Sequence, residues 1–208
     1  MDFELEMCSR FELSSKPCGL LENFGIKNVP MGFKLEEVYP SNNVLCFNNS
    51  GAFIRRWGLQ VNWSNNLLFN ARAETLLKKH TFRPFLKSKC LVPATAYFEW
   101  QQFGTHRIKN KIFLKNQEFF GLAGVTNGDT LIIITRTSPS SIAHINRRMP
   151  MIVPQSAQKQ WNNNSYPIQD SLELIYADLD VLLSVEEDQH MASQMDLFET
   201  YPQIIKGE

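Results

Sequence analysis

Residues 70–75 read Asn-Ala-Arg-Ala-Glu-Thr and residues 89–100 read Lys-Cys-Leu-Val-Pro-Ala-Thr-Ala-Tyr-Phe-Glu-Trp, and these two segments guide the interpretation of the chain. Asn70 and Arg72 stand two residues apart, so in an extended segment both side chains project to one side. An amide and a guanidinium placed in this way can bind a phosphate or a developing oxyanion. Glu99 stands between Phe98 and Trp100, where poor hydration favours the neutral carboxyl and raises its pKa towards the range useful for proton transfer. The segments therefore predict a site that binds an anion and moves protons.

Short strand patterns dominate the sequence around these segments. They cover residues 44–47, 53–59, 111–114, 119–126 and 130–135, and the last two flank a hairpin loop at Asn127-Gly128-Asp129. Helical patterns are fewer, at residues 16–24, 73–79, 140–147 and 156–162, and Ser138 and Pro139 supply the third with an N-cap and a first-turn proline. Many short strands with a few helices predict an α+β fold around a curved sheet.

The composition is that of one globular domain. The chain has 208 residues, of which 43% are hydrophobic and 15 are phenylalanine, and this is enough to bury a sizeable core. The longest apolar runs, such as residues 131–134, are far too short to span a bilayer. The first six residues lack the basic and apolar segments of a signal peptide. We therefore expect a soluble cytoplasmic protein with no membrane segment.

The four cysteines do not form a recognisable metal or disulfide pattern. Cys8, Cys18, Cys46 and Cys90 include no Cys-x-x-Cys pair and have no ligand-like spacing with the four histidines. We therefore expect no metal, no cofactor and no disulfide framework. Taken singly, each cysteine is more typical of a small buried hydrophobic residue than of a nucleophile, and only its sequence context distinguishes Cys8.

The charge is unevenly distributed although the formal net charge is zero. Residues 55–148 contain 15 Lys/Arg against 4 Asp/Glu, an excess of +11. Residues 1–54 contain 4 against 7, and residues 149–208 contain 2 against 10. A short charge run usually marks a solvated face, but a whole middle segment polarised in this way indicates a site for a polyanion.

An ordered series of segments resembles the SOS-response-associated peptidase (SRAP) family, whose members capture abasic sites in single-stranded DNA. The series consists of Met-Cys-Ser-Arg-Phe at residues 7–11, Arg-Trp-Gly-Leu at 56–59 with Trp63, residues 70–75, Phe-Arg at 82–83, residues 90–100, and Arg-Met-Pro at 148–150. It spans residues 7–155. The resemblance implies an SRAP-like fold, with a curved, barrel-like, mixed or antiparallel sheet and a few flanking helices. It also implies single-stranded DNA with abasic sites as the partner, and we expect a monomer.

The resemblance implies that Cys8 forms the covalent link to DNA. The aldehyde of an opened abasic sugar reacts with the α-amine of an N-terminal cysteine, and the thiol then closes a thiazolidine ring in an intramolecular step. This chemistry needs a free amine, so we expect residues 1–7 to be a leader that is absent from the mature protein or cleaved off. Residues 8–180 form the single domain of this interpretation, and residues 181–208 form an acidic tail with a surface helix followed by loose chain.

The resemblance also assigns roles to other residues. Asn70 orients the cysteine or the sugar oxygen, and Glu99 protonates the ring oxygen and shuttles protons during cross-linking and self-reversal. The candidate DNA-binding residues are Arg10, Arg56, Trp57, Trp63, Arg72, Arg83, Thr135 and Arg148. The arginines bind phosphates, one of the two tryptophans stacks as a wedge beside the lesion, and Thr135 places a hydroxyl near the DNA.

Two positions depart from the family pattern. Ser9 stands in the place of a glycine, and Asn146 stands where relatives carry the catalytic histidine. His144 lies two residues upstream and can substitute only if the local backbone shifts register. Asparagine can hydrogen-bond to the sugar but cannot exchange protons, so the proton transfer depends mainly on Glu99.

Two alternatives remain beside a lyase-type enzyme that cross-links to abasic DNA. The first is a thiol peptidase, a hydrolase activity that could be limited to the chain's own leader; the absence of histidine at position 146 weakens this alternative. The second is a non-catalytic module for single-stranded DNA in which the leader blocks Cys8.

Overall fold

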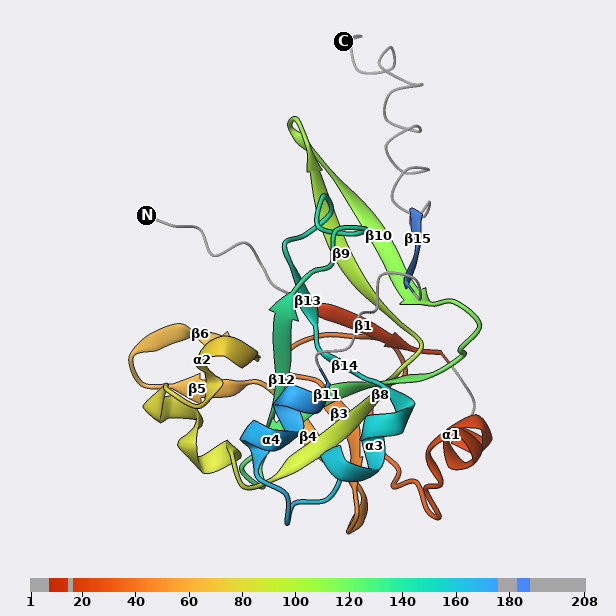
Figure 1. The fold of residues 1–208 in the computed structure, drawn as a ribbon. Coiled ribbons are helices and arrows are strands. Elements are labelled where there is room, and N and C mark those ends of the chain that lie inside the picture. Colours follow the sequence, from red (N-terminus) through yellow and green to blue (C-terminus); the bar gives the residue numbers. More distant parts are fainter. Residues whose placement is uncertain (1–7, 15–16, 176–182, 188–208) are drawn as a thin grey trace, which may run out of the picture.

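The computed structural model describes residues 8–14, 17–175 and 183–187, which form two main sheets with short helices around them (Figure 1). The first sheet is antiparallel and has the strand order β15-β10-β9-β1-β2. Its strands are β1 (Arg10–Leu13), β2 (Glu36–Val38), β9 (Ala96–Phe103), β10 (His106–Leu114) and β15 (Leu183–Glu187). Figure 1 shows β9 and β10 as a long hairpin that rises from the body of the molecule.

The second sheet curves until it closes on itself. Its strand order is β13-β12-β4-β3-β8-β11-β14, and an additional pairing joins β11 to β12, so that five strands complete a ring. The ring strands are β3 (Asn43–Asn48), β4 (Gly51–Trp57), β8 (Lys89–Ala94), β11 (Phe120–Thr126) and β12 (Thr130–Thr137). The sheet is mixed, because β12 pairs in parallel with β4 and with β7 (Asn70–Arg72). The predicted α+β fold with a curved, barrel-like sheet is confirmed.

The remaining elements are short. They are β5 (Leu59–Val61), β6 (Ser64–Leu68), β13 (Arg148–Pro150), β14 (Ile152–Val153), α1 (Pro17–Phe24), α2 (Ala73–Leu76), the 3₁₀ helix η1 (His80–Phe85), α3 (Gln155–Trp161) and α4 (Ile168–Leu174). Strands β5 and β6 pair only with each other. No helix within the described ranges has both the length and the apolar character needed to cross a membrane.

The core lies on both faces of the ring strands. Every residue of β8 and of β11 is buried, which explains why these segments read as continuous apolar runs rather than alternating ones. One face packs against Trp57 and the β1 residues, and the other packs against Trp161 of α3. At Gly124 a Cβ atom would lie 2.8 Å from the Leu131 side chain, so a larger residue there would force the packed side chains to move.

Most of the predicted strands are present, with shifted ends. The hairpin loop is confirmed, because Asn127 Oδ1 accepts hydrogen bonds from the backbone N–H groups of Asp129 and Thr130 and Gly128 has a φ of 104°. The strand predicted at 53–59 ends earlier, because Gly58 breaks it with a φ of 111° between β4 and β5. The strand predicted at 111–114 is the last part of the much longer β10.

The helix predicted at residues 140–147 is wrong. The segment forms isolated turns, in which Pro139 O accepts from the N–H groups of Ile142 and Ala143. The Ser138 N–H donates to Arg147 O at 2.9 Å and closes the loop, so the chain can return alongside β12 as β13. A single turn is a costly helix nucleus, and this tertiary pairing outweighs its extension.

The start of the acidic tail also differs from the prediction. Residues 183–187 form β15, which pairs with β10 from Asn110 to Leu114, instead of the predicted surface helix. An edge position on an existing strand offers hydrogen-bond partners that a solvated helix lacks. The rest of the predicted tail helix and the leader at residues 1–7 lie outside the described residues. Helix α4 is described but was not predicted.

Candidate functional site

The pairing of β1 with β9 brings Cys8 beside Glu99. Arg10 lies opposite Phe98 in this antiparallel pair, so the chain entering β1 runs along the part of β9 that carries the carboxylate. The Cys8 backbone N–H donates to Glu99 Oε1 at 3.0 Å, across 91 residues of sequence. Both residues are buried. The sequence therefore folds so that Cys8 and the buried carboxyl of Glu99 share one site.

Asn70 holds the other polar group of Cys8. Strand β7 pairs in parallel with β12, and Asn70 lies opposite Ile133. From there Asn70 Nδ2 donates to Cys8 O at 3.0 Å. The predicted contact between Asn70 and the cysteine is present, and both backbone groups of Cys8 are fixed by side chains predicted for the site.

Asn146 contacts Glu99 from the loop between β12 and β13. Its Nδ2 donates to Glu99 Oε2 at 2.7 Å, while its Oδ1 accepts from the Arg148 backbone N–H at 3.0 Å. The second bond fixes the orientation of the amide, because only the nitrogen is left to face the carboxyl. His144 is exposed, and none of the described contacts joins it to Glu99. The structure thus brings Asn146, and not His144, to the carboxyl.

Burial sets the protonation of the site at neutral pH. Glu99 is 1% exposed, and desolvation raises its pKa from 4.5 to about 8, against the opposing effect of the hydrogen bonds from Asn146 and Cys8. Desolvation also raises the pKa of the Cys8 thiol well above its usual value, and the Glu99 charge adds to the increase. Carboxyl and thiol therefore both retain protons near pH 7.

Tyr97 adds a third ionisable group to the site. It precedes Glu99 by two residues on β9, so the two side chains lie on the same face of the strand. Its side chain is fully buried, and its hydroxyl makes no hydrogen bond among the described residues. Burial raises the pKa of Tyr97 well above its usual value, with smaller contributions from the charges of Glu99 and Cys8.

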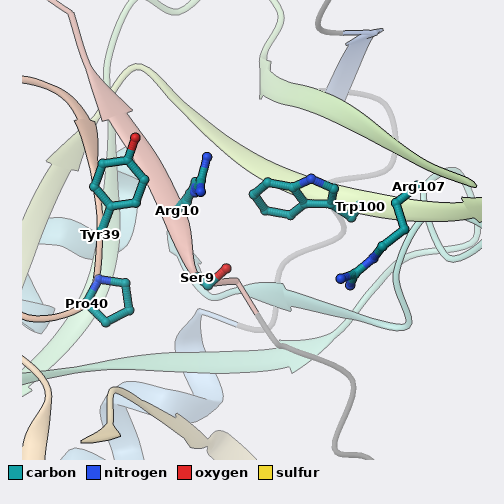
Figure 2. A pocket seen from close by; sticks show the side chains of 6 residues that line it. All are labelled: Ser9, Arg10, Tyr39, Pro40, Trp100 and Arg107. Carbon is teal, nitrogen blue, oxygen red and sulfur yellow. The ribbon is translucent and has the colours of Figure 1, made fainter. Parts of the chain in front are cut away.

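A cavity of about 360 Å³, which we call the Arg10 pocket, has Ser9, the residue after Cys8, in its lining, and Figure 2 shows the side chains that line it. Its lining residues are Ser9, Arg10, Tyr39, Pro40, Trp100 and Arg107. The Arg10 guanidinium lies 4.5 Å from the ring centroid of Tyr39 and 5.0 Å from that of Trp100, and Arg10 Nη1 pairs with Glu37 at 3.2 Å. In Figure 2 Arg10 and Arg107 lie on either side of Trp100. Only Arg10 was predicted for DNA binding, because Tyr39 and Arg107 belong to no motif and only the β1–β2 and β9–β10 pairings bring them here.

The arginines that follow the two site amides lie together. Arg148 forms a bidentate pair with Glu74, with distances of 2.7 and 3.1 Å. Its Nη2 also donates to Thr135 O and Oγ1, and Thr135 is fully buried. Arg72 is exposed, lies opposite Thr135, and helps to lower the pKa of Glu74. Thr135 therefore orients Arg148 and has no exposed surface of its own.

Four of the predicted DNA-binding residues lie elsewhere. Trp57 is fully buried, donates its indole N–H to Phe69 O at 2.9 Å and packs against Phe11, so it belongs to the core and cannot act as a wedge. Trp63 is 69% exposed between β5 and β6 and is the tryptophan that remains available. Arg56 and Arg83 are exposed on β4 and η1, and no described contact joins them to Cys8 or Glu99.

Among the described residues, no group of three or more His, Cys, Asp or Glu side chains is arranged to hold a metal ion. Cys46 and Cys90 are buried in the core as predicted, and the side chain of Cys18 lies outside the described part of the chain.

Comparison with known proteins gives one consistent family. Residues 7–187 match the family model of the SOS response associated peptidase (SRAP). The abasic site processing protein YoqW of Bacillus subtilis (strain 168) is 33% identical over 180 residues, which cover 76% of this chain and 80% of that protein. The abasic site processing protein YobE of the same organism is 31% identical over 97% of this chain and 100% of that protein.

Solved structures share the fold. A protein from Bacteroides thetaiotaomicron superimposes with a TM-score of 0.72 at 22% identity, covering 89% of this chain and 94% of that one. A protein from Bordetella bronchiseptica superimposes with a TM-score of 0.74 at 16% identity, covering 86% of this chain and 99% of that one. At such low identities the likeness concerns the fold alone.

Proposed function

Since the chain belongs to the SOS response associated peptidase family, we propose that it processes abasic sites in single-stranded DNA by forming a covalent link through Cys8. The observation that carries this proposal is the hydrogen bond from the Cys8 nitrogen to Glu99 Oε1 at 3.0 Å. It places the atom that would become the reactive amine against a carboxyl whose pKa is raised to about 8. The names of the curated relatives, which describe abasic site processing proteins, support the substrate class.

The proposed reaction needs only protein groups and the opened sugar. Glu99 donates its proton to the sugar ring oxygen, and the ring opens to the aldehyde. The free Cys8 amine adds to the aldehyde carbon, and the resulting carbinolamine loses its hydroxyl as water to leave an imine. The Cys8 sulfur then bonds to the imine carbon while the imine nitrogen gains a proton. The net change is aldehyde plus cysteine to thiazolidine plus water, and Glu99 is the acid and base for each proton.

The positions of the arginines around the site support a DNA strand that passes over Cys8. Arg72 and Arg148 each stand two residues beyond a site amide, Asn70 and Asn146 respectively. The Arg10 pocket, whose lining includes Ser9, combines two guanidinium groups with the Trp100 ring. Guanidinium groups bind phosphates and aromatic rings stack with unpaired bases, so this arrangement suits a flexible single strand better than a rigid duplex.

Removal of the chain's own leader is a second activity, and the observation that favours it is the 3.0 Å hydrogen bond between the Cys8 nitrogen and Glu99 Oε1. In the sequence that includes Met7, the Cys8 nitrogen belongs to the peptide bond after that residue. If the Cys8 thiol adds to that carbonyl carbon, the C–N bond breaks, Glu99 gives its proton to the leaving nitrogen, and water hydrolyses the thioester. None of the described histidines contacts Cys8, so a general thiol peptidase is the less favoured alternative.

The proposed function is tested with protein whose mass shows that it begins at Cys8. This protein is expected to form an adduct with an abasic single strand that survives heating in denaturant, whereas an intact strand gives none. Cys8→Ala and protein with an acetylated Cys8 amine are expected to form no adduct. A full yield of heat-stable adduct from Cys8→Ala would mean that another nucleophile is responsible, and the proposal would be lost. Intact mass of protein from the native gene shows separately whether the leader is removed.

A further inference from the structure

Two buried groups in the site, the Tyr97 hydroxyl and the Cys8 sulfur, have few hydrogen-bond partners or none among the described residues. The Tyr97 hydroxyl is fully buried and has no partner among the described residues. Leaving a buried donor unpaired destabilises a fold, and native structures avoid it unless the group serves another purpose. The described Cys8 sulfur has only one long contact, in which it donates to Arg10 O at 3.9 Å. As a thiolate, this sulfur would have no hydrogen-bond donor.

The fold buries these two groups in the same part of the core. Cys8 and Tyr97 belong to one hydrophobic cluster, together with Phe11 and Ile112. Tyr97 lies opposite Phe11 of β1 and opposite Ile112 of β10, so it occupies the middle strand of the sheet that carries Cys8 at its entrance. Burial is the main cause of the raised pKa of Tyr97, and charge on Glu99 and on Cys8 adds to the increase.

A hydrogen-bond donor at the sulfur favours ring closure, because it stabilises the thiolate that attacks the imine carbon. Glu99 is the charged group that acts on the Cys8 thiol among the described residues, and its negative charge opposes the thiolate. Arg10 contributes only its backbone oxygen, since its guanidinium is held between Tyr39 and Trp100. A neutral hydroxyl that keeps its own proton can stabilise a thiolate without competing for the proton that Glu99 removes.

We propose that the Tyr97 hydroxyl is a catalytic hydrogen-bond donor to the Cys8 thiolate in the ring-closing step. This inference rests on the proposed function and assigns a residue to its last step. Glu99 takes the thiol proton, the sulfur electron pair forms the bond to the imine carbon, and the C=N π pair moves to the nitrogen, which receives the proton back from Glu99. The Tyr97 O–H bond does not break. The high pKa of Tyr97 suits this role, because the phenol stays neutral while the thiolate forms.

The test uses Tyr97→Phe, which removes only the hydroxyl, in protein that begins at Cys8. Tyr166→Phe is the matched control, because Tyr166 is 47% exposed and contributes only backbone atoms to the described hydrogen bonds. With an abasic single strand, Tyr97→Phe is expected to form the imine at the normal rate. It is expected to close the ring roughly ten- to a hundredfold more slowly, as expected for a hydrogen bond to a charged group. Borohydride reduction traps the imine, so the ratio of trapped imine to thiazolidine should rise in this variant and stay unchanged in the control.

Two further readouts distinguish a failure of this inference from a failure of the proposed function. Without DNA, the rate at which a haloacetamide alkylates Cys8 is followed against pH, and Tyr97→Phe is expected to move the thiol titration to higher pH. The thermal midpoint is expected to stay the same or rise, because an unpaired buried hydroxyl has been removed. A wild-type ring-closing rate together with an unshifted alkylation profile would overturn the inference. Loss of folding in Tyr97→Phe would also overturn it, since the hydroxyl would then have a structural partner.

Discussion

The fold buries two ionisable side chains to the same extent and treats them differently. Glu99 and Lys89 are each 1% exposed. The Lys89 ammonium donates to Tyr166 O and to Ser171 Oγ, the latter at 2.9 Å, and lies 6.0 Å from the Trp161 ring centroid. Burial lowers the pKa of Lys89, and the Asp170 charge opposes that shift. These contacts join β8 to α4, so the buried ammonium holds two parts of the fold together.

The Glu99 region has the opposite character. The hydrogen bonds of Glu99 come from Cys8 and Asn146, and neither belongs to a strand pairing or a helix cap. The neighbouring Tyr97 hydroxyl has no described partner. Burial of a charged group costs free energy in both places, and hydrogen bonds offset part of it at both, so the difference lies in the unpartnered Tyr97 hydroxyl beside Glu99. The difference teaches that burial alone does not identify a reactive group. Incomplete hydrogen bonding around a buried group is the more informative sign.

The largest expected effect comes from removing the acid at the reactive site. Glu99→Gln keeps the shape of the side chain, and its amide oxygen can accept from Cys8 or from Asn146 but not from both, and it cannot transfer protons. Adduct formation is expected to slow by ~10²–10⁴-fold, the usual contribution of one general acid–base group. Initial rates on an abasic single strand at several pH values measure this. Wild-type rates should also fall above about pH 8, where Glu99 loses its proton. Equal rates for wild type and Glu99→Gln would remove Glu99 from the mechanism.

The same variant has an expected effect on stability. The pKa of Glu99 is raised on folding, from 4.5 to about 8. The folded state therefore binds the proton more tightly, and this contribution is fully present below pH 4.5 and is lost as pH rises through about 8. Glu99→Gln does not ionise, so its stability relative to wild type should be greater at pH 9 than at pH 6. Urea unfolding at these two pH values provides the comparison.

The next effect sharpens the role of the amide beside Glu99. Asn146→His introduces a group that can donate and accept a proton near neutrality. It is expected to speed cross-linking and its reversal by ~10²-fold or less. His144→Ala is the matched control and should change little, because His144 is exposed and has no described contact with Glu99. If His144→Ala were as damaging as Glu99→Ala, His144 would be the catalytic histidine and the register used here would be wrong.

At the structural site the expected effect is on folding and not on chemistry. Lys89→Met removes the ammonium and leaves Tyr166 O and Ser171 Oγ with one partner fewer. The free energy of unfolding is expected to fall by ~2 kcal/mol, while the cross-linking rate well below the thermal midpoint stays at the wild-type value. Lys87→Met, at an exposed position two residues earlier, is the control. A large loss of cross-linking rate in folded Lys89→Met protein would contradict the distinction between the two sites.

The smallest effect concerns a single phosphate contact. Arg72→Ala is expected to weaken binding to abasic and intact single strands by the same factor and to reduce the slope of log affinity against log salt by ~1. Lys159→Ala on α3 is the control, because it removes an exposed charge outside the site. Fluorescence anisotropy at several salt concentrations measures both. An unchanged slope in Arg72→Ala would mean that Arg72 contacts no phosphate.

Local sequence predicted the parts of this site that depend on neighbouring residues. The aromatic flanks of Glu99 indicated a shielded carboxyl, and the spacing of Asn70 and Arg72 indicated a shared side. Tyr39 and Arg107 were not found, because their position depends on strand pairings between distant segments. Trp57 was assigned to DNA because a buried and an exposed tryptophan look alike in sequence.

The same limit applies to the fold. Strands with alternating or continuous apolar residues were predicted because burial imposes those patterns. The helix at residues 140–147 was wrong because the deciding contact, from Ser138 N–H to Arg147 O, joins the two ends of a loop and leaves no periodic signal. Strand β15 was missed for a related reason. Its exposed, acidic residues reflect an edge position, and only the partner strand β10 makes it a strand.

The placement of the four tryptophans gives the molecule two separate optical signals. Trp57 and Trp161 are fully buried, with their indole N–H groups bonded to backbone oxygens. Trp63 is 69% exposed, and Trp100 lines the Arg10 pocket. Indole emission depends on the polarity around the ring, so the buried pair reports loss of the core. Under the proposed function a bound DNA strand covers the other pair and changes its emission. Intrinsic fluorescence then gives separate signals for folding and for the proposed binding in one unlabelled sample.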